Sequence, residues 1–204
     1  MAKTMIPSEQ QVTTAGQINK AVANYRALLE KHAGEFQAET VQTVLGMQEL
    51  ASEMFALFQK RVEMVSNIIR RAVKVDRTKT AAQVVDATGR IKWYIDEEVL
   101  AEMPLEGLAK DRVEFFELDY DPTVDELDRE YEAHGLRPDP AAVAQVMADD
   151  PAFADERPVA VQWRDKRGRA CYAIFGRGGG RRGVDVRRRG SRWYRHYRFA
   201  GVRK

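Results

Sequence analysis

Apolar residues recur at steps of three and four through the first third of the chain, which is the spacing of an amphipathic helix. One such pattern runs from about Thr13 to His32, and Gly34 follows where a helix would end. A second runs without proline from about Phe36 to Lys74. At about 1.5 Å per residue, the second helix would be about 55 to 60 Å long and the first about half that. The sequence therefore predicts a helical hairpin whose first helix covers only part of the second.

The uncovered apolar stripe of the long helical pattern requires a further surface to pack against. That surface is the rest of the chain, a second copy of the chain or a membrane. The polar side of the pattern mixes both signs of charge instead of being uniformly basic, so a membrane is the least favoured of the three. Self-association would use the stripe residues Phe55, Phe58, Val62, Val65 and Ile69.

Short helical and strand patterns alternate between residues 75 and 156. Thr80 with Gln83, and Thr123 with Glu126, have the spacing of a capping box, in which two side chains satisfy the first backbone N–H groups of a helix. Strand-like runs rich in aromatic and β-branched residues lie between the helical ones, at "IKWYI" and "RVEFFEL". These patterns predict a compact α+β region.

From Val159 the period of the pattern changes to two. Four segments are expected to form an antiparallel meander with glycine-containing turns: "VAVQWRD", "RACYAIF", "GVDVRRR" and "RWYRHYRF". In the third segment, arginines and Asp185 alternate with valines, so one face of the meander is basic. The overall expectation is an α+β fold: an N-terminal helical hairpin with one long helix, then a small α+β unit that ends in an antiparallel β-meander.

Three regions of different charge follow from these boundaries. Residues 1–74 form the helical hairpin and oligomerisation region, residues 75–156 an acidic α+β region, and residues 157–204 the basic meander, with 75–204 as one folded unit. The net charge of +2 conceals the contrast, because residues 96–156 carry 4 basic and 20 acidic side chains and residues 157–204 carry 16 and 2. Such blocks attract partners of opposite charge, including each other.

The basic region has the composition of a nucleic-acid surface. Arginine binds phosphates and stacks on bases, and aromatic rings provide stacking platforms. The same face could instead dock on an acidic protein surface, its own acidic region included, or serve only solubility. The candidate contacts to a nucleic acid or nucleoprotein complex are Arg177, Arg181, Arg182, Arg187, Arg189, Arg192, Trp193, Tyr194, Arg195, Tyr197 and Arg198.

The glycines of this region satisfy a dinucleotide-binding pattern without its structural context. Gly178, Gly180 and Gly183 fit G-x-G-x-x-G, but that motif needs a following helix whose N-terminal amides meet the pyrophosphate. A strand pattern, "VDVRRRG", follows here. We therefore expect a hairpin loop in which glycine supplies a positive φ.

An acidic motif after a hydrophobic strand raises the question of an enzyme. Asp119, Asp121 and Thr123 resemble the D-x-D-x-T nucleophile loop of haloacid-dehalogenase phosphatases, which use magnesium. The following residues predict a helix and a meander instead of repeated βα units, and Thr123 already caps a helix. A solvated turn is the favoured interpretation, and a magnesium-dependent phosphatase-like site is the minor alternative.

Few residues of this sequence have the spacing of a metal or redox site. Cys171 is the only cysteine and is expected to be a small buried side chain, while the three histidines lie far apart. We therefore expect no catalytic or metal site, no cofactor and no small-molecule substrate. No stretch is long and apolar enough for a signal or a membrane span, so the expected location is the host cytoplasm or a particle assembled there.

Three segments toward the end of the chain are distinctive: "DPAFADE", "QWRDKRGRACYAIF" and the terminal "RFAGVRK". Over about residues 75–204 the chain resembles an uncharacterised family of small proteins from phages and other mobile elements. The resemblance implies an accessory protein and carries no known activity. The expected function is therefore a non-enzymatic accessory protein that binds nucleic acid or a nucleoprotein complex. The alternative is an assembly protein that self-associates through its long helix and docks on protein partners through its charged blocks.

Overall fold

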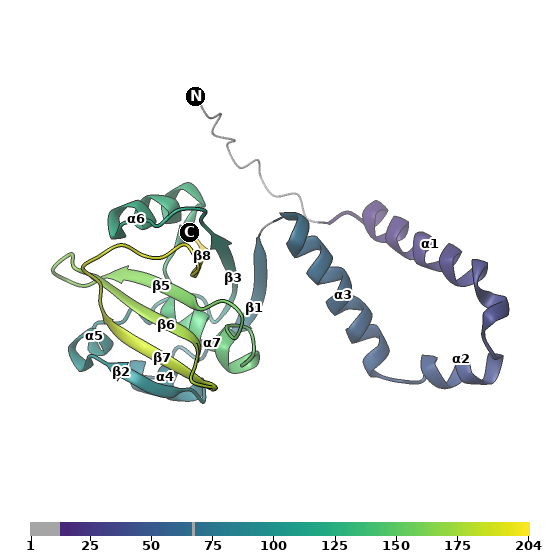
Figure 1. Ribbon diagram of the computed structural model, residues 1–204, viewed down its shortest axis with the longest axis horizontal. Coiled ribbons are helices and arrows are strands. Elements are labelled where there is room, and N and C mark those ends of the chain that lie inside the picture. Colours follow the sequence, from purple (N-terminus) through teal and green to yellow (C-terminus); the bar gives the residue numbers. More distant parts are fainter. Residues whose placement is uncertain (1–12, 67) are drawn as a thin grey trace, which may run out of the picture. The chain divides into compact units, whose positions relative to one another are not determined.

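An α+β fold with one mixed, mostly antiparallel sheet is seen in the computed structural model, which describes residues 13–66 and 68–204 (Figure 1). The described helices are α1 (Ala15–Lys31), a 3-10 turn at Ala33–Glu35, α2 (Ala38–Leu45), α3 (Glu49–Ser66), α4 (Ala81–Ala87), α5 (Glu97–Ala101), α6 (Val124–Ala133) and α7 (Pro140–Asp149). The described strands are β1 (Ile69–Lys74), β2 (Ile91–Ile95), β3 (Lys110–Glu117), β4 (Leu136–Arg137), β5 (Val159–Arg164), β6 (Ala170–Gly178), β7 (Arg181–Arg188) and β8 (Arg198–Arg203). The fold class predicted from the sequence is confirmed.

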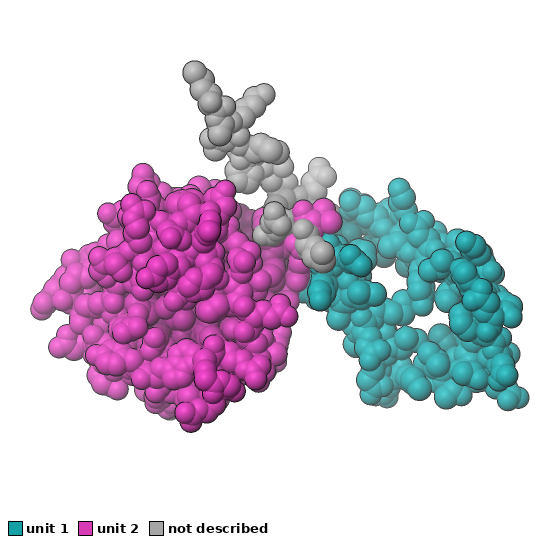
Figure 2. All heavy atoms as spheres, viewed as in Figure 1, with its two compact units in different colours: residues 1–62 teal, residues 63–204 magenta. Residues whose placement is uncertain are grey.

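The chain divides into two compact units between Val62 and Glu63 (Figure 2). This boundary lies before the predicted one at residue 74. The reason is that residues 69–74 form β1, which pairs along its whole length with β3, from Ile69 opposite Phe115 to Lys74 opposite Lys110. This segment contains β-branched residues, which favour a strand, but its apolar residues also fit helical spacing, so the sequence pattern did not reveal that it belongs to the sheet.

The predicted long helix is wrong in two places. Gly46 ends α2, and α3 begins only at Glu49, so the segment is two helices instead of one. Ile69 lies in β1, packed against the core of the second unit, and is therefore no part of a helical interface. In contrast, α1 agrees with the prediction and begins with a capping box between Thr14 and Gln17.

One sheet holds all the strands of the described residues, in the order β1-β3-β8-β5-β6-β7-β2, with β4 paired to β8 beside this path. Most neighbours are antiparallel, but β2 runs parallel to β7, and β5 runs parallel to β8. The connections between parallel strands span a large part of the chain, which is why local patterns could not predict these pairs.

The C-terminal strand differs from the predicted meander. Strands β5, β6 and β7 are antiparallel neighbours as expected. Residues 192–197 are not a strand, and β8 begins only at Arg198 and inserts between β3 and β5. The meander therefore has three strands, and the segment 189–197 is a loop that lies against the sheet through the contacts described below.

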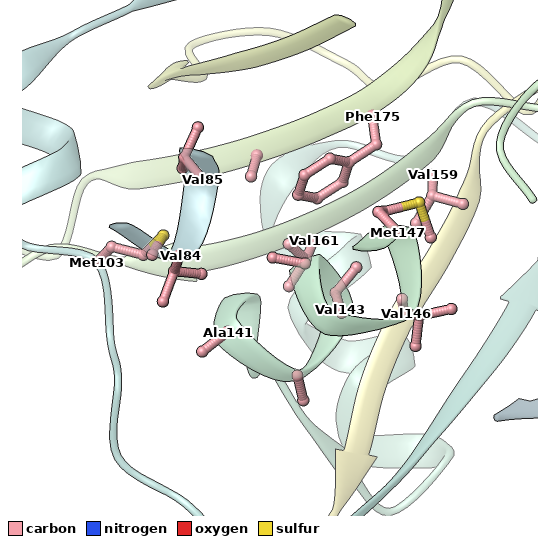
Figure 3. Packing of buried hydrophobic residues seen from close by; sticks show 14 of the residues in the cluster. Val84, Val85, Met103, Ala141, Val143, Val146, Met147, Val159, Val161 and Phe175 are labelled. Atoms are coloured by element: carbon pink, nitrogen blue, oxygen red, sulfur yellow. The ribbon is translucent and has the colours of Figure 1, made fainter. Parts of the chain in front are cut away.

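The first face of the sheet carries the larger core, to which α4, α5 and α7 contribute (Figure 3). From α7, Val143 and Met147 point toward the side chains of Val159 and Phe175, and Val146 belongs to the same core (Figure 3). Alternation along β6 places Cys171, Ala173 and Phe175 in this core, as the period of two predicts.

The second face carries a smaller aromatic core, to which α6 contributes Leu127 and Tyr131. Thr123 caps α6 and Thr80 caps α4 through capping boxes with Glu126 and Gln83, so both predicted caps are confirmed. Each capping residue lies only about one helical turn from its partner in the sequence, so a capping box can be predicted from the sequence alone.

Candidate functional site

Alternation along β6 and β7 directs a row of polar and aromatic side chains to the second face of the sheet. Tyr172 on β6 is paired with Arg187 on β7, and Asp185 lies two residues before Arg187 on the same face. On the neighbouring edge strand β2, Tyr94 is paired with Asp185. Because α6 contributes to the core at β5 and β8, the part of this face at β7 and β2 stays accessible, and Arg187 and Tyr94 are exposed.

Arginines and aromatic rings alternate along this part of the sheet, although the Tyr172 ring itself is buried. The Arg187 guanidinium lies 5.6 Å from the ring centre of Tyr94 and 5.9 Å from that of Tyr172, and its Nε donates a hydrogen bond to the Tyr172 hydroxyl. Arg189 lies 5.8 Å from the ring centre of Tyr172 and 5.9 Å from that of Tyr194. We call these five residues the arginine–tyrosine face. Cation–π contacts of this kind hold the guanidinium planes close to the rings.

The loop of residues 189–197 is attached to the turn before α6. Asp121 binds it twice, because its carboxylate accepts the backbone N–H of Arg195 at 2.7 Å and its carbonyl accepts a hydrogen bond from Arg192 at 3.1 Å. The carbonyl of Pro122 accepts the backbone N–H of Trp193 at 2.7 Å. These contacts fix the loop although it belongs to no strand.

Trp193 anchors the loop in the aromatic core and is unavailable to a ligand. Its side chain is fully buried, and its Nε1 donates a hydrogen bond to Oε1 of Gln162 at 2.7 Å. The prediction that Trp193 is a stacking group is therefore wrong, because the hydrophobic ring is covered by the sheet and by Arg189, 4.6 Å away. Tyr197 is half-buried beside it, and burial raises the pKa of its hydroxyl.

The outer side of the loop carries an exposed aromatic pair. Tyr194 is 55% exposed and stacks on His196 with ring centres 5.7 Å apart and an interplanar angle of 14°. Arg192 and Arg195 flank this pair and are exposed.

The arginines of this loop differ from most others in the second unit. Within residues 13–66 and 68–204, neither Arg189, Arg192 nor Arg195 has a carboxylate within ion-pair distance, and the same holds for Arg181 at the start of β7. Their guanidinium charge is therefore not offset by a direct partner in the described part of the chain. Such groups can bind an external anion without first breaking an ion pair.

Other arginines predicted to contact a ligand are neutralised by the acidic region. Arg182 binds Asp155 through two hydrogen bonds of 2.8 and 2.7 Å, and Arg177 lies 3.6 Å from the same carboxylate. Hydrogen bonding by Arg182 is the main cause that lowers the pKa of Asp155. Arg198 is paired with Glu117 at 3.0 Å. These three side chains join segments of the fold to one another and leave the loop arginines as the free charge.

One acidic side chain interrupts the arginine–tyrosine face. Asp185 lies 3.4 Å from Arg187 and is mostly buried. Burial raises the pKa of its carboxyl, against the opposing effect of the Arg187 charge. Removing its negative charge would leave the face more positive.

The aromatic residues of β2 were missed by sequence reasoning. Tyr94 joins the face only because β2 runs parallel to β7. Ile91 is paired with Gly183, 92 positions later in the chain, and no local pattern predicts that pairing. Trp93 lies over Gly183, where an added Cβ would approach its ring to 2.1 Å, and over Gly178 at 3.4 Å. The glycines of the G-x-G-x-x-G pattern were the available signal, since they leave room for a ring on the strand.

The remaining motif residues have structural contacts. Gly179 and Gly180 have φ values of 56° and 77° and form the two-residue turn between β6 and β7, as the hairpin interpretation predicts. Asp121 of the acidic motif holds the loop, as described above. Cys171 is buried, and burial raises the pKa of its thiol, which disfavours the nucleophilic thiolate.

The described residues contain neither a candidate membrane span nor a candidate metal site. No helix there is both long and apolar enough to span a membrane. No group of three or more histidine, cysteine, aspartate or glutamate side chains is arranged to hold a metal ion in the same part of the chain. No protein-family model matches the sequence, and searches of curated proteins and of solved structures find no significant match.

Proposed function

We propose that the arginine–tyrosine face and the adjoining loop bind single-stranded nucleic acid. The observation that supports this most directly is the set of guanidinium groups without carboxylate partners, Arg189, Arg192 and Arg195, beside the exposed ring of Tyr194. Phosphates would bind the guanidinium groups, and bases would stack on Tyr194 and Tyr94. An accessory role in a phage or mobile element, alone or within a nucleoprotein complex, is compatible with this activity.

Single strands fit this surface better than duplexes do. The aromatic rings are supplied by a sheet and by a loop fixed against it, so they offer flat platforms at the surface. In a duplex the faces of the bases are already stacked on one another, whereas a single strand presents them to protein rings. Stacking contributes about 1 to 3 kcal/mol per base and is tolerant of sequence, so the proposed binding is of low sequence specificity.

The free arginines give the proposal an electrostatic signature. Each phosphate of a single strand that a guanidinium neutralises releases condensed counterions. The logarithm of the binding constant therefore falls as the logarithm of the salt concentration rises, with a slope of about −0.7 per neutralised phosphate. Arginines already paired with Asp155 or Glu117 would contribute little to this slope, because their charge is offset within the protein.

The test is a salt titration of the full chain with a fluorescent single strand of about 12 nucleotides, as DNA and as RNA. We expect the double variant Arg192→Gln with Arg195→Gln to reduce the salt slope by up to about 1.4. The matched control is Lys74→Gln with Lys110→Gln, which removes two exposed positive charges from β1 and β3 at the opposite edge of the sheet. This control should leave the slope nearly unchanged.

Tyr194→Ala separates stacking from charge in the same assay. We expect it to weaken binding by about 1 to 3 kcal/mol with little change in slope, because a ring releases few ions. If the wild type binds neither DNA nor RNA at about 50 mM salt, the proposed function is wrong. Equal loss of affinity in the lysine control and the arginine variant would mean attraction to overall charge instead of a site.

A further inference from the structure

The helices before Val62 expose their apolar residues. Within residues 13–62 the structure buries no side chain. The side chains of this unit do not close into a packed interior in the space-filling view (Figure 2). Large exposed hydrophobic residues occur on all three helices and in their connections: Ile18, Val22, Tyr25, Leu28, Leu29, Phe36, Val41, Val44, Leu45, Met47, Met54, Phe55, Leu57, Phe58 and Val62.

Helices of this length need a packing surface to be stable in water. Isolated helices shorter than about 12 to 15 residues are marginal even with favourable sequences, and α2 has 8 residues. The longer α1 and α3 have apolar stripes, which stabilise a helix only when they are covered. Exposed apolar surface of this kind is typical of interaction sites.

The exposed aromatic rings of the unit offer a substantial part of the area that a stable interface needs. Four aromatic side chains, Tyr25, Phe36, Phe55 and Phe58, are between 43% and 65% exposed. At about 200 Å² for a fully exposed aromatic side chain, they alone offer about 400 Å². A standard interface buries about 800 Å² per partner, so the aromatic rings supply about half of it before any aliphatic residue is counted.

The charge of the unit is compatible with a second copy of the same chain as the partner. Residues 13–62 contain five lysines or arginines and five glutamates, so the unit is neutral and offers no field of one sign to an acidic or basic partner. Arg26 and Glu30 form an ion pair within the unit at 2.7 Å, and Nδ1 of His32 lies within hydrogen-bond distance of Glu35, also at 2.7 Å. A second copy of the same neutral, apolar surface meets it without like-charge repulsion.

We propose that residues 13–62 are a self-association module, in which the apolar stripes of α1 and α3 are covered by the same helices of a second copy. Phe55, Phe58 and Val62 lie at steps of three and four along α3 and form the centre of its stripe. A twofold arrangement would use the same patch on both chains, which suits a self-complementary surface. This inference is independent of the proposed nucleic-acid binding.

The test is the mass of the full chain in solution, measured by light scattering and by analytical ultracentrifugation across a dilution series. We expect more than one chain per particle at about 50 µM, with dissociation on dilution. Phe58→Glu should raise the dissociation constant about 30-fold or more, as loss of a central interface residue does. Helicity measured by circular dichroism should fall on dilution of the wild type, because association stabilises the helices.

Ala56→Glu is the matched control, since it adds the same charge to an exposed position on the polar side of α3, near Glu53 and Lys60. It should leave association unchanged. Because residues 13–62 bury nothing, neither substitution should change the thermal unfolding of the second unit. A wild type that is a monomer at about 50 µM overturns the proposal, whether the helices then bind lipid vesicles, another protein or neither. The proposal is also overturned if Phe58→Glu and Ala56→Glu self-associate with the same dissociation constant.

Discussion

At the scale of single residues, burial decides which side chains of the basic region are available. Trp193 and Tyr194 are neighbours in the sequence, yet the first is fully buried and the second is 55% exposed. Arg198 and Arg195 differ in ion pairing, since Glu117 pairs with the first and no described carboxylate pairs with the second. The functional candidates are therefore a subset of the arginines and aromatic rings that the composition offers.

Asp185 provides a pH-dependent test of this environment. Burial raises the pKa of its carboxyl, so the folded protein holds this proton more tightly than the unfolded chain does. Binding of this proton stabilises the folded protein fully below the pKa that Asp185 has in the unfolded chain. This stabilisation is lost as the pH rises through the pKa that Asp185 has in the folded protein. We expect Asp185→Asn to be more stable than wild type at pH 7, by less than about 2 kcal/mol, with the difference shrinking toward about pH 4.

Urea unfolding at several pH values measures this difference in unfolding free energy. Other carboxylates titrate equally in both proteins and cancel in the comparison. A variant that is less stable than wild type at pH 7 would mean that the ion pair between Asp185 and Arg187 outweighs burial.

At the scale of elements, the position of β2 depends on a ring packed over glycine. An added Cβ at Gly183 would lie 2.1 Å from the Trp93 ring, so Gly183→Ala must displace Trp93 from β7. We expect this substitution to lower the unfolding free energy by about 1 to 3 kcal/mol, as overpacking does. The variant's tryptophan fluorescence should shift toward that of an exposed indole.

Gly190→Ala is the control for this element. Gly190 lies in the loop after β7 with no positive φ, and an added Cβ there meets nothing within 4 Å. It should leave both stability and fluorescence nearly unchanged. If Gly183→Ala and Gly190→Ala have the same unfolding free energy, packing of Trp93 over Gly183 does not contribute to stability.

At the scale of the whole molecule, the two units differ in what stabilises them. Both hydrophobic clusters lie within residues 63–204, whereas residues 13–62 bury nothing. We expect a fragment of residues 63–204 to unfold cooperatively on heating and to be a monomer by light scattering. Failure of this fragment to fold would show that the helices before Val62 contribute to its core.

Self-association and nucleic-acid binding, if both hold, would combine in one particle. Two chains joined through residues 13–62 would present two arginine–tyrosine faces to one strand. The second contact would then be intramolecular and would raise the apparent affinity without any new interaction. The fragment of residues 63–204 should therefore bind a short strand as tightly as the full chain but a long strand more weakly.

Several features of the fold could be predicted from local sequence. The capping boxes at Thr80 and Thr123 and the alternation along β6 depend on neighbours within a few residues, and all are present. The errors lie where distant partners decide. The segment 69–74 has a helical pattern but pairs with β3, and residues 192–197 have a strand pattern but are held as a loop by Asp121 and Pro122.

The sequence by itself determined the fold class, the caps, most element positions and the arginine-rich composition of the C-terminal region. Only the tertiary structure decided which arginines remain free, that Trp193 is core and that Tyr94 joins the candidate face. The physical reason is the separation along the chain between the residues that interact. Helix caps and strand alternation arise from interactions along a few residues, whereas burial, ion pairing and parallel strand pairing join residues that the folded chain alone brings together.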